Sequence, residues 1–153
     1  MQFETLDNHH HKKNFDCGNI EINRYLQTMA NQHHKKGVAK VHILTDGTST
    51  IIGFYTLTST SIELNLKGYP RYTPAIIIGR MGVDKQYQGQ GISKLLLSHA
   101  LQTIKKISLA VGVMIAIIDA KDEGLAQYYQ KFGFLPTQQP LRLILNINTI
   151  SSV

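Results

Sequence analysis

The chain has 153 residues and one cysteine, 42% of its residues are apolar, and its formal net charge is +6. These totals fit one globular domain and exclude a disordered chain and an internal disulfide. No apolar run approaches the about 20 residues of a membrane-spanning helix, and the first residues lack the apolar core of a secretory signal. We therefore expect a soluble, cytoplasmic protein.

The first half of the chain predicts three strands and one helix. Residues 1–7 fit a strand that precedes a polar loop. Apolar side chains at helical spacing predict a helix from about Asn19, which is placed to cap it, to the cationic stretch before Gly37. Two strands rich in Val, Ile, Thr and Tyr, joined by a turn, are expected at 38–44 and 51–64.

The second half predicts an irregular loop and then strands that alternate with helices. In chain order these are a loop at 65–74, a strand at 75–84, a helix at about 91–107, a strand at 112–118, a helix at 122–132, and short strands at 134–135 and 141–147. The expected buried face of the first of these helices is Ile92, Leu95, Leu96, Ala100, Ile104 and Ile107. The order of elements predicts a single α/β (α+β mixed) domain over residues 1–153.

The strand at 75–84 leads into a glycine-rich turn, Gln-Gly-Gln-Gly at 88–91, which opens a helix. Such a turn aims unpaired backbone N–H groups and the positive end of the helix dipole at one point, which favours an anion and most often a phosphate. Two common phosphate motifs are excluded by Lys94. A Walker loop needs a glycine directly before its lysine, and a dinucleotide fingerprint needs a glycine at this position.

The excess positive charge lies in the same part of the chain. Between residues 67 and 106, seven basic side chains accompany the single acid Asp84, whereas basic and acidic side chains balance elsewhere. A solvated basic face is one interpretation. The coincidence with a phosphate-binding type of turn favours an anionic ligand or a nucleic-acid backbone.

Two segments resemble motifs of the GNAT superfamily of N-acetyltransferases. Met-Gly-Val-Asp at 81–84 and Gln-Gly-Gln-Gly-Ile-Ser-Lys at 88–94 are similar to motif A, and Ala-Gln-Tyr-Tyr-Gln-Lys-Phe-Gly-Phe at 126–134 is similar to the family's last helix and following strand. The resemblance implies a mostly antiparallel mixed sheet of about six or seven strands, splayed at the cofactor site and flanked by about four helices.

The resemblance also implies acetyl-CoA as the co-substrate. The amides of residues 89–94 would hold its pyrophosphate, Lys94 would add charge, and the pantetheine arm would pair like an extra strand with residues 81–83. Ser93 stands where the family usually has Gly or Ala, but it is small enough to let the backbone approach the pyrophosphate. The expected coenzyme-binding residues are Met81, Gly82, Val83, Gln88, Gly89, Gln90, Gly91, Ile92, Ser93 and Lys94.

Further similarity extends to one branch of the family. Phe-Asp-Cys-Gly at 15–18, Gly-Phe-Tyr-Thr-Leu at 53–57 and Ile-Gly-Arg-Met at 78–81 resemble bacterial toxins that acetylate the α-amino group of aminoacyl-tRNA and stop translation. This similarity implies an aminoacyl-tRNA substrate and a ribbon–helix–helix antitoxin that neutralises the toxin and represses the operon. The family often forms homodimers.

The thiolate that leaves during acetyl transfer needs a proton, and Tyr129 matches the family tyrosine that supplies it as general acid. The alternative for Tyr129 is a core aromatic beside Phe132 and Phe134, and Tyr128 is expected to pack. No general base is assigned, because a free α-amine with a pKa of about 8 is already partly neutral at neutral pH.

No metal site is expected. Adjacent histidines at 9–11 and 33–34 cannot easily point at one ion, and no cysteine or carboxylate completes a set at zinc spacing. Cys17 is expected to be a small buried residue and not an acetyl carrier, so the transfer should be direct. Glu63 and Asp119 are expected to be solvated or capping carboxylates.

Basic side chains outside the coenzyme motif are candidates for contact with an RNA backbone. Such contacts give affinity but do not select a particular tRNA. Arg71, between Tyr69 and Tyr72, could also stack on unpaired bases. The candidates are Arg71, Arg80, Lys85, Lys105 and Lys106.

Two other functions stay open at this point. One is a GNAT enzyme that acetylates a small amine or a protein amino group. The central segment has almost no acids, which disfavours a polyamine substrate. The other is a non-catalytic GNAT scaffold that binds RNA or a regulator, which the intact Tyr129 and glycine turn disfavour.

Overall fold

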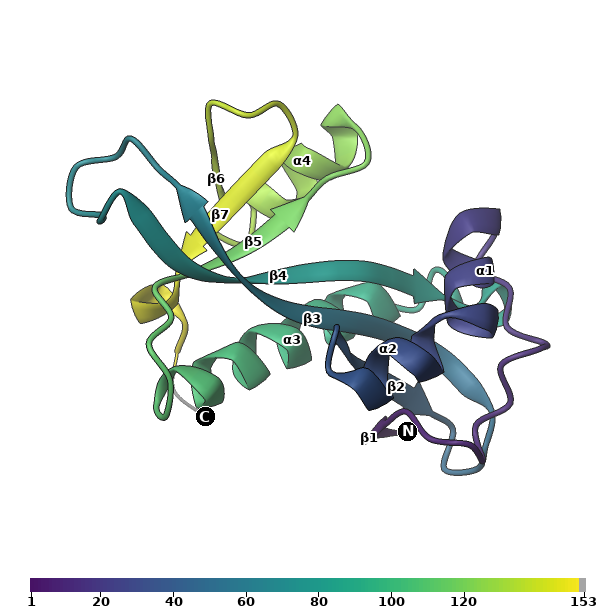
Figure 1. The fold of residues 1–153 in the computed structure, drawn as a ribbon. Helices are drawn as coiled ribbons and strands as arrows, with labels where there is room; N and C mark the ends of the chain where they lie inside the picture. The colour runs from purple at the N-terminus through teal and green to yellow at the C-terminus, as the bar shows by residue number, and fades with distance from the viewer. Residues whose placement is uncertain (152–153) are drawn as a thin grey trace. The chain divides into compact units, whose positions relative to one another are not determined.

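The computed structural model describes residues 1–151 and contains a seven-stranded sheet with the order β1-β2-β3-β4-β5-β7-β6 (Figure 1). The strands are β1 (Gln2–Thr5), β2 (Lys40–Thr45), β3 (Ile51–Glu63), β4 (Tyr72–Val83), β5 (Ile115–Asp119), β6 (Leu135–Pro136) and β7 (Arg142–Asn146). The helices are α1 (Ile20–Thr28), α2 (Ala30–Lys36), α3 (Ile92–Ser108) and α4 (Glu123–Gln130), with short 3-10 helices η1 (Lys85–Tyr87) and η2 (Ile147–Thr149).

The pairing of the strands confirms the expected fold class, a mixed and mostly antiparallel sheet with helices. β4 and β5 are parallel, whereas β2 is antiparallel to both β1 and β3, and β7 is antiparallel to both β5 and β6. No helix within residues 1–151 combines the length and the apolar character that crossing a lipid bilayer requires.

The chain forms two compact units. Unit 1 comprises Met1–Thr58 and Arg80–Ala100, and unit 2 comprises Ser59–Gly79 and the described residues from Leu101 onward. Strands β3 and β4 and helix α3 therefore contribute residues to both units. The core of unit 1 consists of Leu6, Phe15, Tyr25, Leu26, Ala30, Val41, Ile43, Ile51 and Phe54. That of unit 2 includes Ala75, Ile115, Ile117 and Ile144.

The N-terminal helical region begins and ends where the sequence predicts, but it is divided in the middle. The Asn19 side chain caps α1 by accepting hydrogen bonds from the N–H groups of Glu21 and Ile22, and Gly37 ends α2 with a φ of 77°. The single predicted helix is wrong, because the backbone at Met29 leaves helical geometry with a φ of −119°. The apolar spacing continues across this break and so does not reveal it.

Two glycines let unit 1 close tightly around the end of β4. A Cβ on Gly53 would lie 3.0 Å from the carbonyl oxygen of Gly82, and a Cβ on Gly82 would lie 3.2 Å from Sγ of Cys17. The N–H of Asp84, directly after β4, donates to the Ile52 carbonyl at 2.8 Å. The residues that precede the glycine turn are therefore fixed to both β3 and the N-terminal segment.

In unit 2, strand β4 begins earlier than predicted. Residues 72–74 were expected in a loop because proline normally interrupts a strand. Pro74 has no N–H to offer, but its carbonyl accepts a hydrogen bond from the Met114 N–H at 2.9 Å, so the strand begins at Tyr72. β5 begins at Ile115, three residues after the predicted start at Gly112.

The predicted buried face of α3 is corrected at two positions, since Ile107 is only half-buried and Leu95 is exposed. Ile92, Leu96, Ala100 and Ile104 are buried as predicted, whereas Leu95 is 40% exposed and Leu97 is buried in its place. The buried residues at intervals of four form a ridge, and Leu97 lies beside that ridge.

A stack of rings in unit 1 contains a titratable group. The His42 ring lies parallel to Tyr55 at 4.8 Å, and the Tyr55 hydroxyl lies 2.7 Å from Nδ1 of His99. Burial, and secondly the neighbouring His99, lowers the pKa of His42 to about 4. His42 is therefore neutral in the folded protein where an unfolded chain would protonate it.

Stability should fall as the pH is lowered from about 6.5 to about 4, since only the unfolded state takes up a proton at residue 42 in this range. The unfolding free energy above pH 6.5 should exceed that below pH 4 by about 2 kcal/mol from this group, once the partial exposure of the ring is taken into account. His42→Phe keeps the stacked ring and should flatten the pH dependence of the unfolding free energy, measured with urea. An equally steep profile in the variant would contradict this assignment.

Candidate functional site

The predicted anion turn is present in unit 1. Gly89 and Gly91 both have a φ of +79°, and a Cβ on either would meet no atom within 4 Å. The first hydrogen bond of α3 is donated by the Leu95 N–H to the Gly91 carbonyl at 3.2 Å. The N–H groups of residues 92–94 thus precede the first helical donor, have no acceptor within the helix and point toward the turn, where the helix dipole favours an anion. The turn itself is exposed.

Charged side chains near the turn are in part already paired. Lys94 and Ser93 are exposed in the first turn of α3. The Lys85 Nζ lies 3.4 Å from Oδ2 of Asp16. Arg80 lies over the Tyr25 ring with its guanidinium carbon 4.0 Å from the ring centre, a cation–π contact with helix α1. Lys94 is therefore the cation that is best placed beside the turn.

The strand that leads to the turn extends beyond its pairing with β5. The parallel register ends at Ile78 and Ile118, whereas β4 continues to Val83. Met81 is half-buried, and Gly82 and Val83 are buried. This register leaves the end of β4 outside the β4–β5 ladder, as the pairing of an extended ligand with residues 81–83 requires.

Tyr129 lies on α4 in unit 2. Its ring is half-buried against Phe134, with the ring centres 6.2 Å apart, and beside Tyr128 at 5.7 Å. Burial first, and then Tyr128 and Asp122, raise the pKa of Tyr129 above its ordinary value. The phenol is thus fully protonated at neutral pH, which a proton donor requires. Tyr128 packs on Phe132 at 5.1 Å.

The carboxylates of Glu63 and Asp119 are paired with arginines within unit 2. Asp119 accepts from Arg142 through two hydrogen bonds of 2.7 and 2.8 Å, and Glu63 accepts from Arg71 Nε at 2.8 Å. Both carboxylates are exposed, as expected, and each is in addition paired with an arginine.

The RNA candidates of unit 2 are also partly engaged. Arg71 lies 5.3 Å from the ring centre of the exposed Tyr72, while the Tyr69 hydroxyl accepts a hydrogen bond from Asn146, which makes Tyr69 a packing residue. Lys105 donates to the Ile147 carbonyl at 3.3 Å, and Lys106 is exposed.

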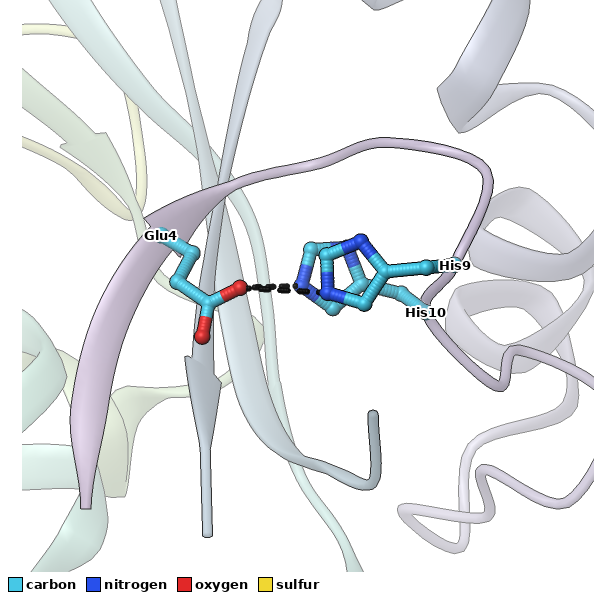
Figure 2. Close-up of side chains that lie close together, drawn as sticks. All are labelled: Glu4, His9 and His10. Carbon is cyan, nitrogen blue, oxygen red and sulfur yellow. Dashed lines mark hydrogen bonds and ion pairs between the residues drawn. The ribbon is translucent and has the colours of Figure 1, made fainter. Parts of the chain in front are cut away.

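The structure forms one cluster that the sequence spacing does not reveal. Glu4 of β1 points toward His9 and His10, with Oε1 at 3.4 Å from His9 Nε2 and 3.0 Å from His10 Nε2 (Figure 2). The expectation that no carboxylate approaches these histidines is therefore wrong. However, His10 Nδ1 accepts the Asp7 N–H at 3.1 Å, so the Nε2 of a neutral ring carries the proton and donates to Glu4. Hydrogen bonds within the chain therefore account for the cluster.

The chain is similar to known acetyltransferases and toxins. A family model described as an acetyltransferase (GNAT) domain matches residues 37–136. A probable toxin TacT from Sinorhizobium fredii (strain NBRC 101917 / NGR234) is 33% identical, over 98% of this chain and 93% of the relative. The structure of AtaT complexed with acetyl-methionyl-tRNAfMet has a TM-score of 0.90 at 27% identity, over 97% of this chain and 96% of that chain. A tyrosine-to-phenylalanine mutant of AtaT, bound to acetyl-CoA and the C-terminus of the antitoxin AtaR, has a TM-score of 0.87 at 28% identity, over 97% and 94% of the two chains.

Replacing Gly91 by alanine should weaken the binding of coenzyme A, the ligand that the sequence resemblance implies. A left-handed alanine costs about 1 kcal/mol or more, so the free turn relaxes out of this conformation and must regain it on binding, which predicts a dissociation constant about 5- to 10-fold higher in calorimetry. Gly47→Ala is the matched control, because Gly47 has a φ of +98° and equally open surroundings but lies in the β2–β3 turn. Equal effects of the two substitutions would contradict a role of Gly91 in binding.

Proposed function

Since the chain belongs to the acetyltransferase (GNAT) family, we propose that it is a toxin that transfers the acetyl group of acetyl-CoA to the α-amino group of an aminoacyl-tRNA and thereby blocks translation. The observation that carries the proposal is the turn of two left-handed glycines, which leads from the end of β4 into the first turn of α3. The binding of acetyl-CoA and tRNA by the similar AtaT structures supports this choice of donor and acceptor.

In the proposed complex, the amides of residues 89–94 bind the pyrophosphate and Lys94 adds positive charge. Residues 81–83 pair with the pantetheine arm through main-chain hydrogen bonds. Both roles are open to the residues involved, because the turn is exposed and its glycines leave free space above the backbone. These assignments place the whole coenzyme-binding motif in unit 1.

The proposed chemistry is a direct transfer. The neutral α-amine attacks the thioester carbonyl, the carbon–sulfur bond breaks, and Tyr129 donates its phenolic proton to the departing thiolate. The nitrogen loses a proton to solvent, and Tyr129 recovers one, so the products are the acetylated amine and free coenzyme A. No strong base is needed, because an α-amine has a pKa of about 8.

The remaining roles follow from this substrate. The phosphates of the tRNA are proposed to contact Arg71, Arg80, Lys85, Lys105 and Lys106. An antitoxin of the ribbon–helix–helix class is the proposed regulator, by analogy with the binding of AtaR to AtaT. A tRNA substrate places the protein in the cytoplasm. We also propose that residues 1–153 form a single domain and that the protein is a homodimer.

Incubation with labelled acetyl-CoA and total charged tRNA should put the label on tRNA. Mild base cleaves the aminoacyl ester, so the label should be released as an N-acetyl amino acid, which chromatography identifies. Binding of acetyl-CoA without labelled tRNA would overturn the toxin assignment and direct the search to small amines and protein termini. Absence of acetyl-CoA binding would overturn the enzyme assignment itself and leave a scaffold that binds RNA or a regulator.

Tyr129→Phe should lower kcat by about 100-fold or more while acetyl-CoA still binds, since only the proton donor is lost. Tyr128→Phe is the matched control, because it removes a hydroxyl from the adjacent ring on the same helix. Single-turnover rates and calorimetry measure the two quantities separately. A Tyr129 variant as fast as the Tyr128 variant would refute the assignment of the general acid.

A further inference from the structure

The Gln88 side chain does not extend toward the exposed glycine turn. Its Nε2 donates to the carbonyl of Cys17 and to the carbonyl of Val83, each at 2.9 Å. The amide has two N–H donors, and these two acceptors use both. Because Gln88 directly precedes Gly89, these bonds fix the start of the turn to the end of β4 and to the N-terminal segment 15–18.

Asp84 and Asp16 make further links between the same two segments. The Asp16 N–H donates to Asp84 Oδ2 at 3.1 Å, and the Lys85 N–H donates to the Asp16 carbonyl at 2.9 Å. The other carboxylate oxygen of Asp84 accepts the Gln86 N–H at 3.0 Å and so caps η1. Three hydrogen bonds therefore hold segment 15–18 against residues 83–88, one from Gln88 to the Cys17 carbonyl and two between Asp16 and residues 84–85.

Segment 15–18 is in turn fixed to helix α1. The Cys17 N–H donates to Asn23 Oδ1, and Asn23 Nδ2 donates to Asp16 Oδ1, both at 2.9 Å. Phe15 is buried and meets Phe54 edge-on with ring centres 5.5 Å apart. The segment thus has its own anchor in the core of unit 1 and its own connection to α1.

We propose that Gln88 is a positioning residue that holds the glycine turn ready for acetyl-CoA by bonding it to segment 15–18, and that this bonding ties coenzyme binding to helix α1. The inference rests on the proposed binding of acetyl-CoA at the turn. Arg80, a candidate RNA contact, lies on the Tyr25 ring of α1. Helix α1 therefore connects the glycine turn with a candidate contact of the tRNA substrate. In this proposal, segment 15–18 (Phe-Asp-Cys-Gly) holds the glycine turn through hydrogen bonds, and this role does not require the Cys17 thiol.

The first test is Gln88→Met, which keeps the length of the side chain and removes both donors. Without these two bonds the free turn is no longer held in its binding conformation and must be ordered when the ligand binds, which predicts a dissociation constant for acetyl-CoA that is about 10-fold higher. Gln88→Arg, whose guanidinium can donate to two carbonyls, should restore most of the affinity. Gln86→Met is the matched control, since Gln86 is exposed and its hydrogen bonds with Asp84 and Gln90 use its backbone N–H and carbonyl.

A second variant tests the connection from its other end. Asp16→Ala lies on the N-terminal segment and removes the acceptor of Asn23, and it should weaken acetyl-CoA binding by about 3- to 5-fold. The effects of Asp16→Ala and Gln88→Met should be less than additive in a double-mutant cycle, because each loosens the same connection. Hydrogen exchange should show that acetyl-CoA protects the amides of residues 20–26 in the wild type and protects them less in Gln88→Met at saturating ligand.

The outcomes separate the inference from the proposed function. If the wild type binds acetyl-CoA and Gln88→Met binds it equally well, the positioning role is wrong while the enzyme assignment stands. The link to α1 would be refuted if the effects of Asp16→Ala and Gln88→Met on acetyl-CoA affinity were strictly additive. It would also be refuted if acetyl-CoA still protected the amides of α1 in Gln88→Met. In either case Gln88 would support only the glycine turn itself. If the wild type does not bind acetyl-CoA, the proposed function fails, and the inference fails with it.

Discussion

The unpaired N–H groups at the start of α3 are the constraint on which the proposed site depends. They precede the first helical hydrogen bond, donated by Leu95, and so need an acceptor from outside the helix. For a ligand to reach them, the chain must turn sharply between β4 and α3, and it does so with left-handed residues at 89 and 91. The close packing of Gly82 on Cys17 and the bond from Asp84 to Ile52 keep this turn at a fixed place on unit 1.

Local signals in the sequence predicted most of the elements, because each depends on neighbouring residues. Asn19 and Asp122 cap their helices through side-chain bonds to N–H groups two or three positions later, and Gly37 ends α2 in the left-handed conformation. The glycine turn belongs to the same class of signal. Periodicity was less informative where a break leaves it intact, as at Met29, and where Leu95 and Leu97, on either side of the buried Leu96, compete for the buried side of α3.

Partners that lie far apart in the sequence could not be predicted in this way. Gln88 and Cys17 are 71 residues apart, and no pattern of residue types announces that one side chain will bond to the other's carbonyl. For the same reason, counting charges along the sequence could not predict which cations are free to bind a ligand. The basic excess looked uniform along the central segment, yet Lys85 and Arg71 are paired with Asp16 and Glu63, which lie outside or at the edge of that segment. The cations that remain for a ligand are decided by the fold.

The carbonyl acceptors of Gln88 have a consequence for how this protein can evolve. Every residue type presents the same main-chain oxygen, so the side chains at 17 and 83 can change without removing the acceptors, within the space that Gly82 leaves. The donor has no such freedom, because few side chains carry two N–H groups at the required reach. The side chains of residues 17 and 83 can therefore vary in evolution while the bonds that fix the start of the glycine turn stay in place.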